Sequence, residues 1–442
     1  MVKLRQTLII IFIFLLIFVM AIDLFAREKA AASSRDSEYE YEYRQNLISM
    51  TLDDYRAYLK THPPLDRLYR QGDICFFLVN TRELSEIEAS GAAIQSREPV
   101  PDYFLNAPSA DSPQGDINGA YHNHNETNAL LRELVSNHPG LAQVTTIGYS
   151  IEGRAINVIK ISDNVSIDEA EPNIFIIGCH HAREWISVEV PLLFAQYLLG
   201  HYQDNPGVKR AVNGAQVYIL PIQNPDGLEF SIHTYRMWRK NRRYNGNLGW
   251  GVDTNRNYGY MWGYDDVGSS PDPYSDVYRG AAPFSEPETR AIRQFLLAHP
   301  PAGTISYHNY SQIIIYPWGY TYTPAPDAGE MNQIAAQMSN LVYQVNGRIY
   351  TYGAAEMLYL TNGDTTDWVY GTFGTPAFTI ELPPDEIVFG GFFTSLELID
   401  SAFRENLPAL LYFVNYFITG ENLVGDPFTV RSPGDLLPKQ YN

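Results

Sequence analysis

Short apolar runs alternate with longer amphipathic segments from about residue 116 to residue 420, and this alternation predicts the fold class. Buried strands are expected where β-branched and aromatic residues cluster. The runs that meet this description span 157–161, 174–177, 216–220, 303–307 and 377–382. Helices are expected between them, as over 187–202, where apolar residues fall on one face. The pattern therefore predicts an α/β domain whose mixed, mostly parallel open sheet is flanked by helices.

Two helix starts carry the signature of a capping box, in which a hydroxyl residue precedes a glutamate by three positions. Ser285 and Glu288 form one such pair, and Thr394 and Glu397 form the other. The second pair opens the long last helix, which we expect to end at Gly420 because glycine commonly terminates helices.

Residues 1–26 differ in kind from the rest of the chain. Lys3 and Arg5 precede fifteen unbroken apolar residues, 8–22, and Ala26 follows them. A basic start, an apolar stretch and a small residue are typical of a secretory signal peptide. An uncleaved membrane anchor is the alternative, although fifteen apolar residues are short for a span that needs about 20. We expect a secreted, extracellular protein without stable membrane association once this segment is removed.

A smaller module precedes the large domain. Segment 27–114 begins polar and acidic, and then predicts a strand over 73–79 and a helix over 81–90 that ends at Gly91. Its proline-rich passage, 98–113, indicates a linker. A small α+β module of this kind before a large domain suggests a pro-segment, and a structural extension is the alternative. The predicted organisation is a signal peptide (1–26), a pro-segment with linker (27–114), a large domain (115–420) and an irregular tail (421–442).

Composition excludes several classes of protein. The chain has 442 residues, of which 45% are hydrophobic, so it can bury a conventional core. Its formal charge of −19 argues against nucleic acid and anionic membrane surfaces as partners. Only two cysteines are present, Cys75 and Cys179, so we expect no disulfide framework.

The segment 173–186, NIFIIGCHHAREWI, joins a predicted strand to metal-ligating side chains. His181 and Glu184 stand three positions apart, so one turn can direct both toward one ion. Histidine and carboxylate ligands with one position left for water make up the hydrolytic zinc arrangement. Cys179 could be a nucleophile or a ligand, but we interpret it as a small buried residue beneath this loop.

Two residues at other strand ends complete the candidate site. His308 lies 124 positions after Glu184, at the end of one predicted strand, and Glu381 lies in the apolar run AFTIEL. Ligands bind beyond the carboxyl ends of strands in open sheets. Taken alone, His308 could be a core histidine whose hydrogen bonds are satisfied. Glu381 taken alone could be a salt-bridged glutamate, since a carboxylate in a core is rarely left unpaired. Together with His181 and Glu184 they predict a zinc site of two histidines and one glutamate, with a carboxylate base beside it.

Basic residues stand out in this acidic chain. The segments MWRKNRR and VDTNRNYG contain Arg239, Asn255 and Arg256, which are candidates for holding an anion. A guanidinium suits a carboxylate because its planar fork bonds both oxygens. For Arg242 and Arg243 we expect only surface solubility.

The chain resembles the zinc metallocarboxypeptidases of the carboxypeptidase A and B family over about 115–420, and in particular their carboxypeptidase T branch. The motifs that carry the resemblance are, in order, HAREW, NPDG, WRKNRR, VDTNRNYG, YRGAAPFSEPET, SYHNYSQIIIYPWGYTYT and FTIEL. The resemblance implies one zinc ion per chain held by His181, Glu184 and His308. It also implies that Glu381 is the base and that Arg239 polarises the scissile carbonyl.

Further roles follow from the same resemblance. Asn255 and Arg256 would hold the free C-terminal carboxylate of the substrate. Tyr359 would close over the substrate and Arg183 would line an outer subsite. Asp253 would orient the first zinc-binding histidine. The implied activity is hydrolysis of the last peptide bond of peptides and proteins, by a protein that we expect to be a monomer.

The segment GDTTDW is expected to determine which C-terminal residues of the substrate are accepted. In the resembling enzymes the residue before the Asp-Trp pair discriminates between substrates, and here it is Thr366, with Asp364 two positions earlier. This arrangement is similar to carboxypeptidase T and implies mixed specificity, for hydrophobic and for basic C-terminal residues. The alternative is that Asp364 only caps a loop. The acidic loop 162–173 resembles a region near calcium in carboxypeptidase T, so calcium is a second metal to consider.

Two other functions remain open at this point. One is a non-catalytic relative that binds zinc and peptide, although retention of Glu381 beside all three ligands argues against it. The other is a cell-wall peptide amidase of the same broad family, which a substrate panel would separate.

Overall fold

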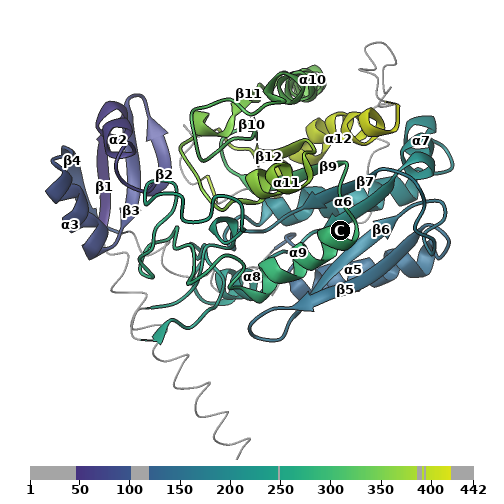
Figure 1. Ribbon diagram of the computed structural model, residues 1–442, viewed down its shortest axis with the longest axis horizontal. Helices are drawn as coiled ribbons and strands as arrows, with labels where there is room; N and C mark the ends of the chain where they lie inside the picture. Colours follow the sequence, from purple (N-terminus) through teal and green to yellow (C-terminus); the bar gives the residue numbers. More distant parts are fainter. Residues whose placement is uncertain (1–45, 101–118, 247–248, 386–390, 393–394, 420–442) are drawn as a thin grey trace, which may run out of the picture.

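The computed structural model describes residues 46–100, 119–246, 249–385, 391–392 and 395–419. The expected signal peptide, the expected tail, most of the proline-rich passage, Thr394 and Gly420 lie outside these residues. In the described part of the chain, no helix combines the length and apolar character needed to cross a membrane. The described residues form a small N-terminal module, 46–100, beside a large α/β body (Figure 1).

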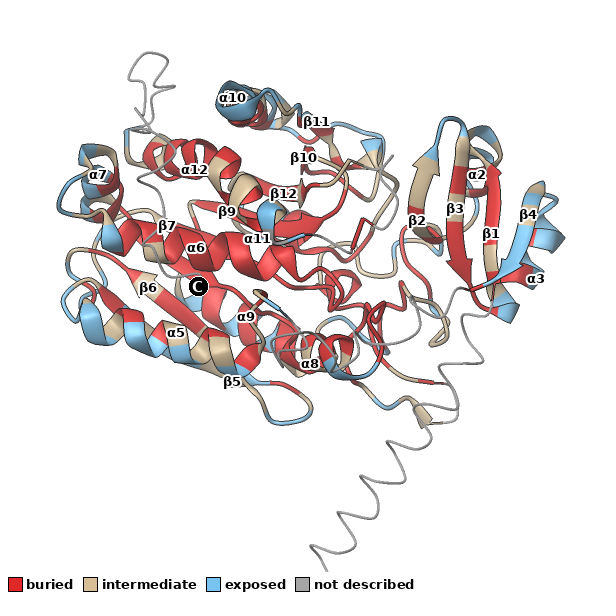
Figure 2. Cartoon of the chain, turned by 180° about the vertical axis from the view of Figure 1, so that it is seen from behind, coloured by how far each residue is buried: buried red, intermediate tan, exposed pale blue. Residues whose placement is uncertain are grey.

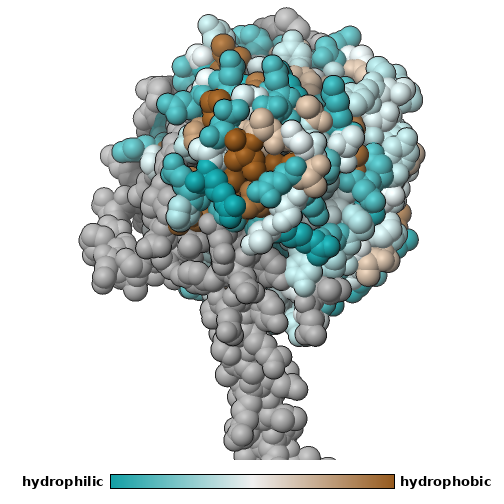
Figure 3. Space-filling view, turned by 90° about the vertical axis from the view of Figure 1, so that its left-hand side faces the viewer, coloured by the Kyte–Doolittle hydropathy of each residue, from teal (hydrophilic) through white to brown (hydrophobic). Residues whose placement is uncertain are grey.

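The N-terminal module is a four-stranded antiparallel sheet with two helices. Its strands, in the order β2-β3-β1-β4, span Asn46–Thr51 (β1), Asp66–Gln71 (β2), Ile74–Val79 (β3) and Ile94–Pro99 (β4). Its helices span Leu52–Tyr58 (α2) and Thr81–Ser90 (α3). The predicted helix over 81–90 is confirmed: Asn80 caps it and Gly91, at φ 79°, ends it. Ile48, Phe77 and Ile87 form a core within the module, whose outward face is largely hydrophilic around a small apolar patch (Figure 3).

The large body is built on an eight-stranded sheet in the order β11-β10-β12-β9-β7-β8-β6-β5. Four neighbouring pairs are parallel and three are antiparallel, which confirms the mixed, mostly parallel open sheet. The strands span Ala142–Tyr149 (β5), Ala155–Ile161 (β6), Asn173–Ile177 (β7), Gln216–Leu220 (β8), Gly303–Asn309 (β9), Ile313–Tyr316 (β10), Thr351–Ala354 (β11) and Ala377–Leu382 (β12). All five predicted strands are among them.

Helices cover both faces of this sheet (Figure 2). They span His124–Asn137 (α5), Ile186–Gly200 (α6), Pro206–Gly214 (α7), Pro225–His233 (α8), Pro287–Ala298 (α9), Ala328–Asn346 (α10), Thr365–Phe373 (α11) and Leu396–Thr419 (α12), with 3₁₀ turns at Thr254–Arg256 (η2) and Ala355–Met357 (η3). The helix predicted over 187–202 is present as α6. Its apolar surface is wider than the single face that the sequence predicted, because α6 is buried on nearly all sides. It packs on the sheet, against β6, β8 and β9, and is flanked by the helices α5 and α12.

The start of α9 corrects one prediction. Ser285 and Glu288 form no capping box, because the helix begins at Pro287 with Glu286 in the N-cap position. Proline favours the first helical position, since its φ is already helical and its missing N–H would have no partner there. The Ser285 hydroxyl instead donates to Glu286 Oε1 over 2.8 Å.

The carboxyl ends of three strands meet at one edge of the sheet. β7, β9 and β12 lie side by side and parallel, so they all point toward this edge. The loop 178–185 leaves β7 there, and His308 and Glu381 lie near the ends of β9 and β12. The sheet therefore brings together side chains that are far apart in the sequence.

The N-terminal module packs against this same edge. Leu68 and Leu78 of the module join Met237, Tyr310 and Phe392 of the large body in one apolar cluster. The Tyr310 hydroxyl donates to the backbone oxygen of Arg67 over 2.9 Å. The module thus lies over the residues that the sequence predicted as a site.

Candidate active site

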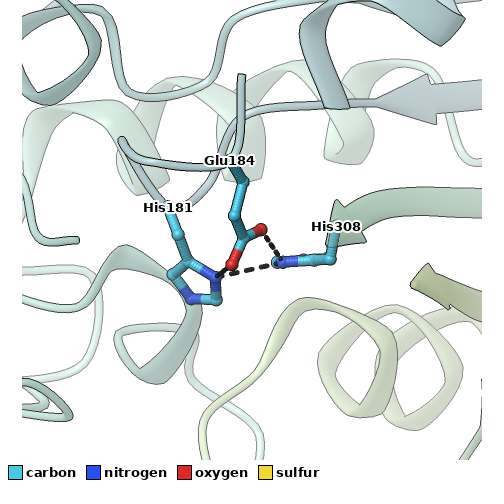
Figure 4. Close-up of side chains that lie close together, drawn as sticks. All are labelled: His181, Glu184 and His308. Carbon is cyan, nitrogen blue, oxygen red and sulfur yellow. Dashed lines mark hydrogen bonds and ion pairs between the residues drawn. The ribbon is translucent and has the colours of Figure 1, made fainter. Parts of the chain in front are cut away.

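Three side chains with metal-ligating atoms converge at the sheet edge (Figure 4). His181 Nδ1 lies 2.7 Å from Glu184 Oε1, and His308 Nδ1 lies 2.9 Å from Glu184 Oε2. The two Nδ1 atoms are 3.1 Å apart. All three side chains are buried. Two imidazole nitrogens and one carboxylate facing a common point fit the three-ligand hydrolytic zinc set.

The protonation of the histidines suits metal binding, which requires neutral rings. Burial and the nearby Arg239 guanidinium lower the pKa of His181 to about 4 and that of His308 to about 3. His181 Nε2 lies 3.3 Å from Asp253 Oδ1. A proton on Nε2 is therefore stabilised, and the lone pair of Nδ1 is left toward Glu184 and His308.

Asp253 also fixes Arg239. Its Oδ2 accepts from Arg239 Nε over 3.1 Å and from Nη2 over 2.7 Å, and its Oδ1 accepts from the backbone N–H of Asn255 over 2.8 Å. Burial alone would raise the pKa of Asp253, but Arg239, His181 and Arg256 hold it well below its usual range. The carboxylate stays charged and orients one histidine and one guanidinium together.

Glu381 lies beside His181, Glu184 and His308, which we call the metal-ligating set. In the parallel register of β12 on β9 it is the direct neighbour of His308. Its half-buried side chain lines the same cavity as His181, Glu184 and Arg239. Burial and then the Glu184 carboxylate raise the pKa of Glu381 well above that of an ordinary glutamate, against the opposing effect of Arg239. A carboxyl with a raised pKa can accept and return a proton near neutral pH.

Asn255 and Arg256 lie on the η2 turn behind the metal-ligating set. Both are buried, and Asn255 Oδ1 accepts from the Thr365 backbone N–H over 3.0 Å and from its hydroxyl over 2.7 Å. Arg256 donates through Nε to the Gly268 oxygen over 3.1 Å and through Nη1 to the Asn255 oxygen over 2.7 Å. These bonds hold the guanidinium in one orientation.

Tyr359 and Arg183 line the cavity that contains Glu381. The N-terminal module also contributes residues to it, among them Asp66 and Arg67. Asp66 forms a buried ion pair with Arg183. The cavity is therefore shared between the two bodies.

Asp364 is the N-cap of α11, as the capping alternative expected. Its Oδ1 accepts from the Asp367 backbone N–H and from the Thr366 hydroxyl, each over 2.9 Å. Its Oδ2 accepts from the Thr361 hydroxyl over 2.6 Å. Both oxygens are thus engaged in the loop, and a buried negative charge is kept close to Thr366.

Three acidic side chains gather in the loop expected near calcium. Asp163, Glu169 and Glu171 each offer a carboxylate oxygen, and these atoms lie within 4.8 Å of one another. Burial and the two neighbouring carboxylates raise the pKa of Glu171. Cys179 belongs neither to this acidic group nor to the metal-ligating set. It is buried and forms no disulfide, and burial raises the pKa of its thiol.

Several contacts at the candidate site were not predicted from the sequence. Asp66 and Arg67 have no local signal, because they belong to a separate module and reach the cavity only by docking. His180 was not predicted as part of the site, because the sequence pattern offered a role for only one histidine of the pair His180–His181, that of metal ligand. Thr365 and Ser306 are ordinary polar residues in the sequence, and only the packed structure gives them partners.

Comparisons with known proteins agree with this geometry. The profile of the family described as zinc carboxypeptidase matches residues 127–409. Carboxypeptidase A1 from Mus musculus is 36% identical over 265 residues, which cover 59% of this chain and 62% of the relative. A zinc carboxypeptidase from Saccharothrix mutabilis subsp. capreolus is 31% identical over 325 residues, covering 71% of this chain and 73% of the relative. The chain thus spans about three fifths of the mouse enzyme that it matches.

The likeness extends to three dimensions. The crystal structure of carboxypeptidase A from Helicoverpa armigera superposes with a TM-score of 0.70 at 25% identity, covering 86% of this chain and 99% of that chain. The family match includes the metal-ligating set, Arg239 and Glu381 within more than half of the chain. The chain belongs to the zinc carboxypeptidase family.

Proposed function

We propose that this protein is a zinc-dependent exopeptidase that hydrolyses the C-terminal peptide bond of peptides and proteins. The observation that carries the proposal is the register of β12 on β9, which sets Glu381 directly beside His308 of the metal-ligating set. His181, Glu184 and His308 would hold the zinc. When bound, zinc lowers the pKa of a coordinated water to about 7 and polarises a carbonyl.

The side chains then divide the remaining work. Glu381 takes a proton from the attacking water and passes it to the leaving amine, a task for which its raised pKa suits it. Arg239, oriented by Asp253, donates hydrogen bonds to the carbonyl oxygen as negative charge develops there. Because the Asp253 contact is already formed, little reorganisation of the guanidinium is needed.

The substrate would be recognised by its free end. Arg256 and Asn255 hold the terminal carboxylate, so internal peptide bonds are not cleaved. Arg183 and Tyr359, which line the cavity with Glu381, contact the residues on the other side of the scissile bond or close over it. The acidic charge of the chain fits peptide rather than nucleic-acid partners, and we propose a monomer.

Mixed specificity is part of the proposal, and so is membership of the carboxypeptidase T branch. The small, uncharged side chain of Thr366 would accept apolar C-terminal residues, and the charge of Asp364 would favour lysine and arginine. The capping bonds of Asp364 do not remove its charge, so it can attract a cation without giving up the loop.

The module 46–100 would act as a pro-segment of a secreted zymogen. Its support is the position of Asp66 and Arg67 in the wall of the cavity. The sequence pattern of 1–26 supports export. Calcium at Asp163, Glu169 and Glu171 is proposed as a structural ion, because three carboxylates offer the oxygen ligands that it prefers.

The test is a panel of blocked dipeptides with varied C-terminal residues, together with cell-wall peptides, assayed on protein from which the N-terminal module has been cleaved. Each peptide is run with and without a zinc chelator, beside its C-terminal amide. We expect chelator-sensitive release of the last residue from free acids only. Equal cleavage of amides contradicts the carboxylate clamp, no cleavage of any peptide favours a non-catalytic binding protein, and cleavage confined to cell-wall peptides favours the amidase.

A further inference from the structure

His180 is a buried histidine that the proposed chemistry leaves without a role. It adjoins His181 in the loop after β7, but its side chain does not join the metal-ligating set. Instead its ring stacks on that of His308, with centroids 5.3 Å apart and planes inclined by 12°. Its nitrogens contact three hydroxyl groups, those of Ser306, Thr365 and Tyr258.

The direction of each hydrogen bond follows from the metal-ligating set. His308 Nδ1 faces Glu184 and must keep its lone pair for a metal, so the proton of a neutral His308 ring lies on Nε2. That N–H donates to Ser306 Oγ over 3.1 Å. The Ser306 hydroxyl is then free to donate to His180 Nδ1, which lies 3.2 Å away.

The hydrogen bonds keep the same direction through His180. With Nδ1 accepting, a neutral His180 ring carries its proton on Nε2, which donates to Thr365 Oγ1 over 2.8 Å. The Tyr258 hydroxyl oxygen is a second acceptor at 3.0 Å. Thr365 in turn donates its own hydroxyl proton to Asn255 Oδ1 over 2.7 Å. One consistent direction therefore runs from His308 to Asn255 through three side chains.

The two ends of this chain of hydrogen bonds lie close together, although the two facing nitrogens are both donors and form no hydrogen bond with each other. Asn255 Nδ2 lies 3.5 Å from His308 Nε2, so the first and last residues of the chain are in contact. His308, Ser306, His180 and Thr365 are all essentially inaccessible to solvent, so water cannot replace a lost partner. A metal ligand and a substrate-binding amide thus belong to one buried chain of hydrogen bonds.

We propose that His180 is a positioning residue that couples the metal ligand His308 to the substrate-binding residue Asn255. Through Ser306 it fixes the tautomer and orientation of His308, and through Thr365 it orients the amide of Asn255. The inference rests on the proposed function, because it takes Asn255 to contact the substrate carboxylate. It adds a role for a residue outside the metal-ligating set and the carboxylate clamp.

His180 has two arms, the hydrogen bond of Nδ1 with Ser306 and that of Nε2 with Thr365. Two substitutions test these arms separately. His180→Asn retains a polar atom near the Nδ1 position and can keep the bond to Ser306. His180→Gln retains one near the Nε2 position and can keep the bond to Thr365. Zinc affinity is measured without substrate, by equilibrium dialysis at buffered free zinc. Binding of a blocked dipeptide is measured calorimetrically in zinc-saturated protein that also carries Glu381→Gln, so that no turnover occurs.

We expect His180→Gln to weaken zinc binding about 10-fold, the low end of the effect of losing an outer partner of a metal ligand, because His180 acts on His308 through Ser306. It should leave dipeptide binding within about threefold of the parent. His180→Asn should show the reverse, with zinc affinity retained and dipeptide affinity reduced about 10-fold. Tyr258→Phe is the matched control, because it removes a hydroxyl that contacts His180 but belongs to neither arm.

Each contrary result has a distinct meaning. Equal losses of both affinities in His180→Asn and His180→Gln would make His180 a packing residue and overturn the coupling. Unchanged affinities in both variants would overturn it as well. If Asn255→Ala leaves dipeptide binding unchanged, the carboxylate clamp itself fails, and the coupling with it. If Asn255→Ala weakens binding but His180→Asn does not, only the coupling is overturned.

Discussion

Asp66 and Arg183 form a two-pronged ion pair between the N-terminal module and the loop that carries two of the metal-ligating residues. Arg183 Nη1 lies 2.7 Å from Asp66 Oδ2, and Nη2 lies 2.6 Å from Oδ1. Both side chains are almost entirely buried. A guanidinium in this geometry is held in one orientation and is withdrawn from any other anion. Arg183 therefore cannot serve an outer subsite while the module is docked.

The first prediction concerns this ion pair. In the uncleaved chain, Asp66→Ala should raise kcat/KM on a blocked dipeptide at least about 10-fold, because removal of one partner of a buried pair costs the docked state about 3–5 kcal/mol. In protein cleaved after the module, the same substitution should change nothing. Asp53→Ala, at an exposed position of the same module, is the control. Equal activity of the cleaved and uncleaved parents would show that the module does not inhibit.

Metal binding gives the second prediction. His181→Ala and His308→Ala should each lose the zinc and the activity, because two protein ligands cannot hold the ion as three do. Metal content by mass spectrometry and peptide hydrolysis measure the two losses separately. Cys179→Ala should keep both, since its buried thiol lies outside the metal-ligating set. Full activity in a preparation free of metal would be decisive against the zinc assignment.

A third prediction isolates the base. Glu381→Gln should bind zinc and dipeptide as the parent does but lose nearly all turnover, because an amide of the same shape cannot accept the proton. In the parent, the pKa of Glu381 is raised above 4.5, so kcat/KM should decline as the pH falls through that raised value and the carboxylate becomes protonated. Turnover within a few-fold of the parent in the amide variant would assign the base to another residue.

Specificity supplies the fourth prediction. Asparagine caps helices about as well as aspartate, so Asp364→Asn should preserve the start of α11 while removing the charge. Substrates ending in lysine or arginine should then lose about 10-fold in kcat/KM, and those ending in leucine or phenylalanine should barely change. A comparison of the two classes in one variant cancels any general damage. An equal loss on both would leave Asp364 with its capping role alone.

The fifth prediction concerns stability and pH. Burial raises the pKa of Glu288 to about 8, so between pH 4.5 and 8 the folded protein binds a proton that the unfolded chain releases. Stability should therefore fall as the pH rises through this window. Glu288→Gln should match the parent near pH 5 and exceed it near pH 9, by a difference on the order of a few kcal/mol. Chemical denaturation at the two pH values measures it.

Glu286 provides the matched control for that experiment. Its Oε2 accepts from Arg243 Nε over 3.0 Å, so Glu286→Gln breaks an ion pair and should destabilise the protein at high pH. If Glu288→Gln were also less stable than the parent near pH 9, the ionised carboxylate of Glu288 would stabilise the folded protein, contrary to its raised pKa.

The sequence predicted the sheet, and it singled out three side chains that the structure brings together, for related reasons. The strands β8 and β12 are short apolar runs whose limits coincide with changes in residue type. His181 and Glu184 are close in the sequence, and His308 ends a strand that must lie in the same sheet. Parallel pairing then brings the three together without any detail of side-chain packing.

Features that depend on packing between distant segments could not be predicted in this way. Asp66 reaches Arg183 only because two bodies dock, and no periodicity in the sequence encodes docking. The start of α9 depends on Pro287. The preference of proline for the first helical position outweighs the predicted capping box of Ser285 and Glu288, which lie on either side of it. His180 differs from His181 only in which way its side chain turns from the backbone.

The pairing of Glu381 with His308 on adjacent parallel strands has a consequence for how function depends on correct assembly. Side chains alternate between the two faces of a sheet, so a slip of β12 by one residue would turn Glu381 to the opposite face and bring Ile380 or Leu382 level with the histidine. The sheet would keep most of its hydrogen bonds, while the proposed base would be lost. Turnover in this protein should therefore report the alignment of two central strands, and not only the presence of a folded sheet.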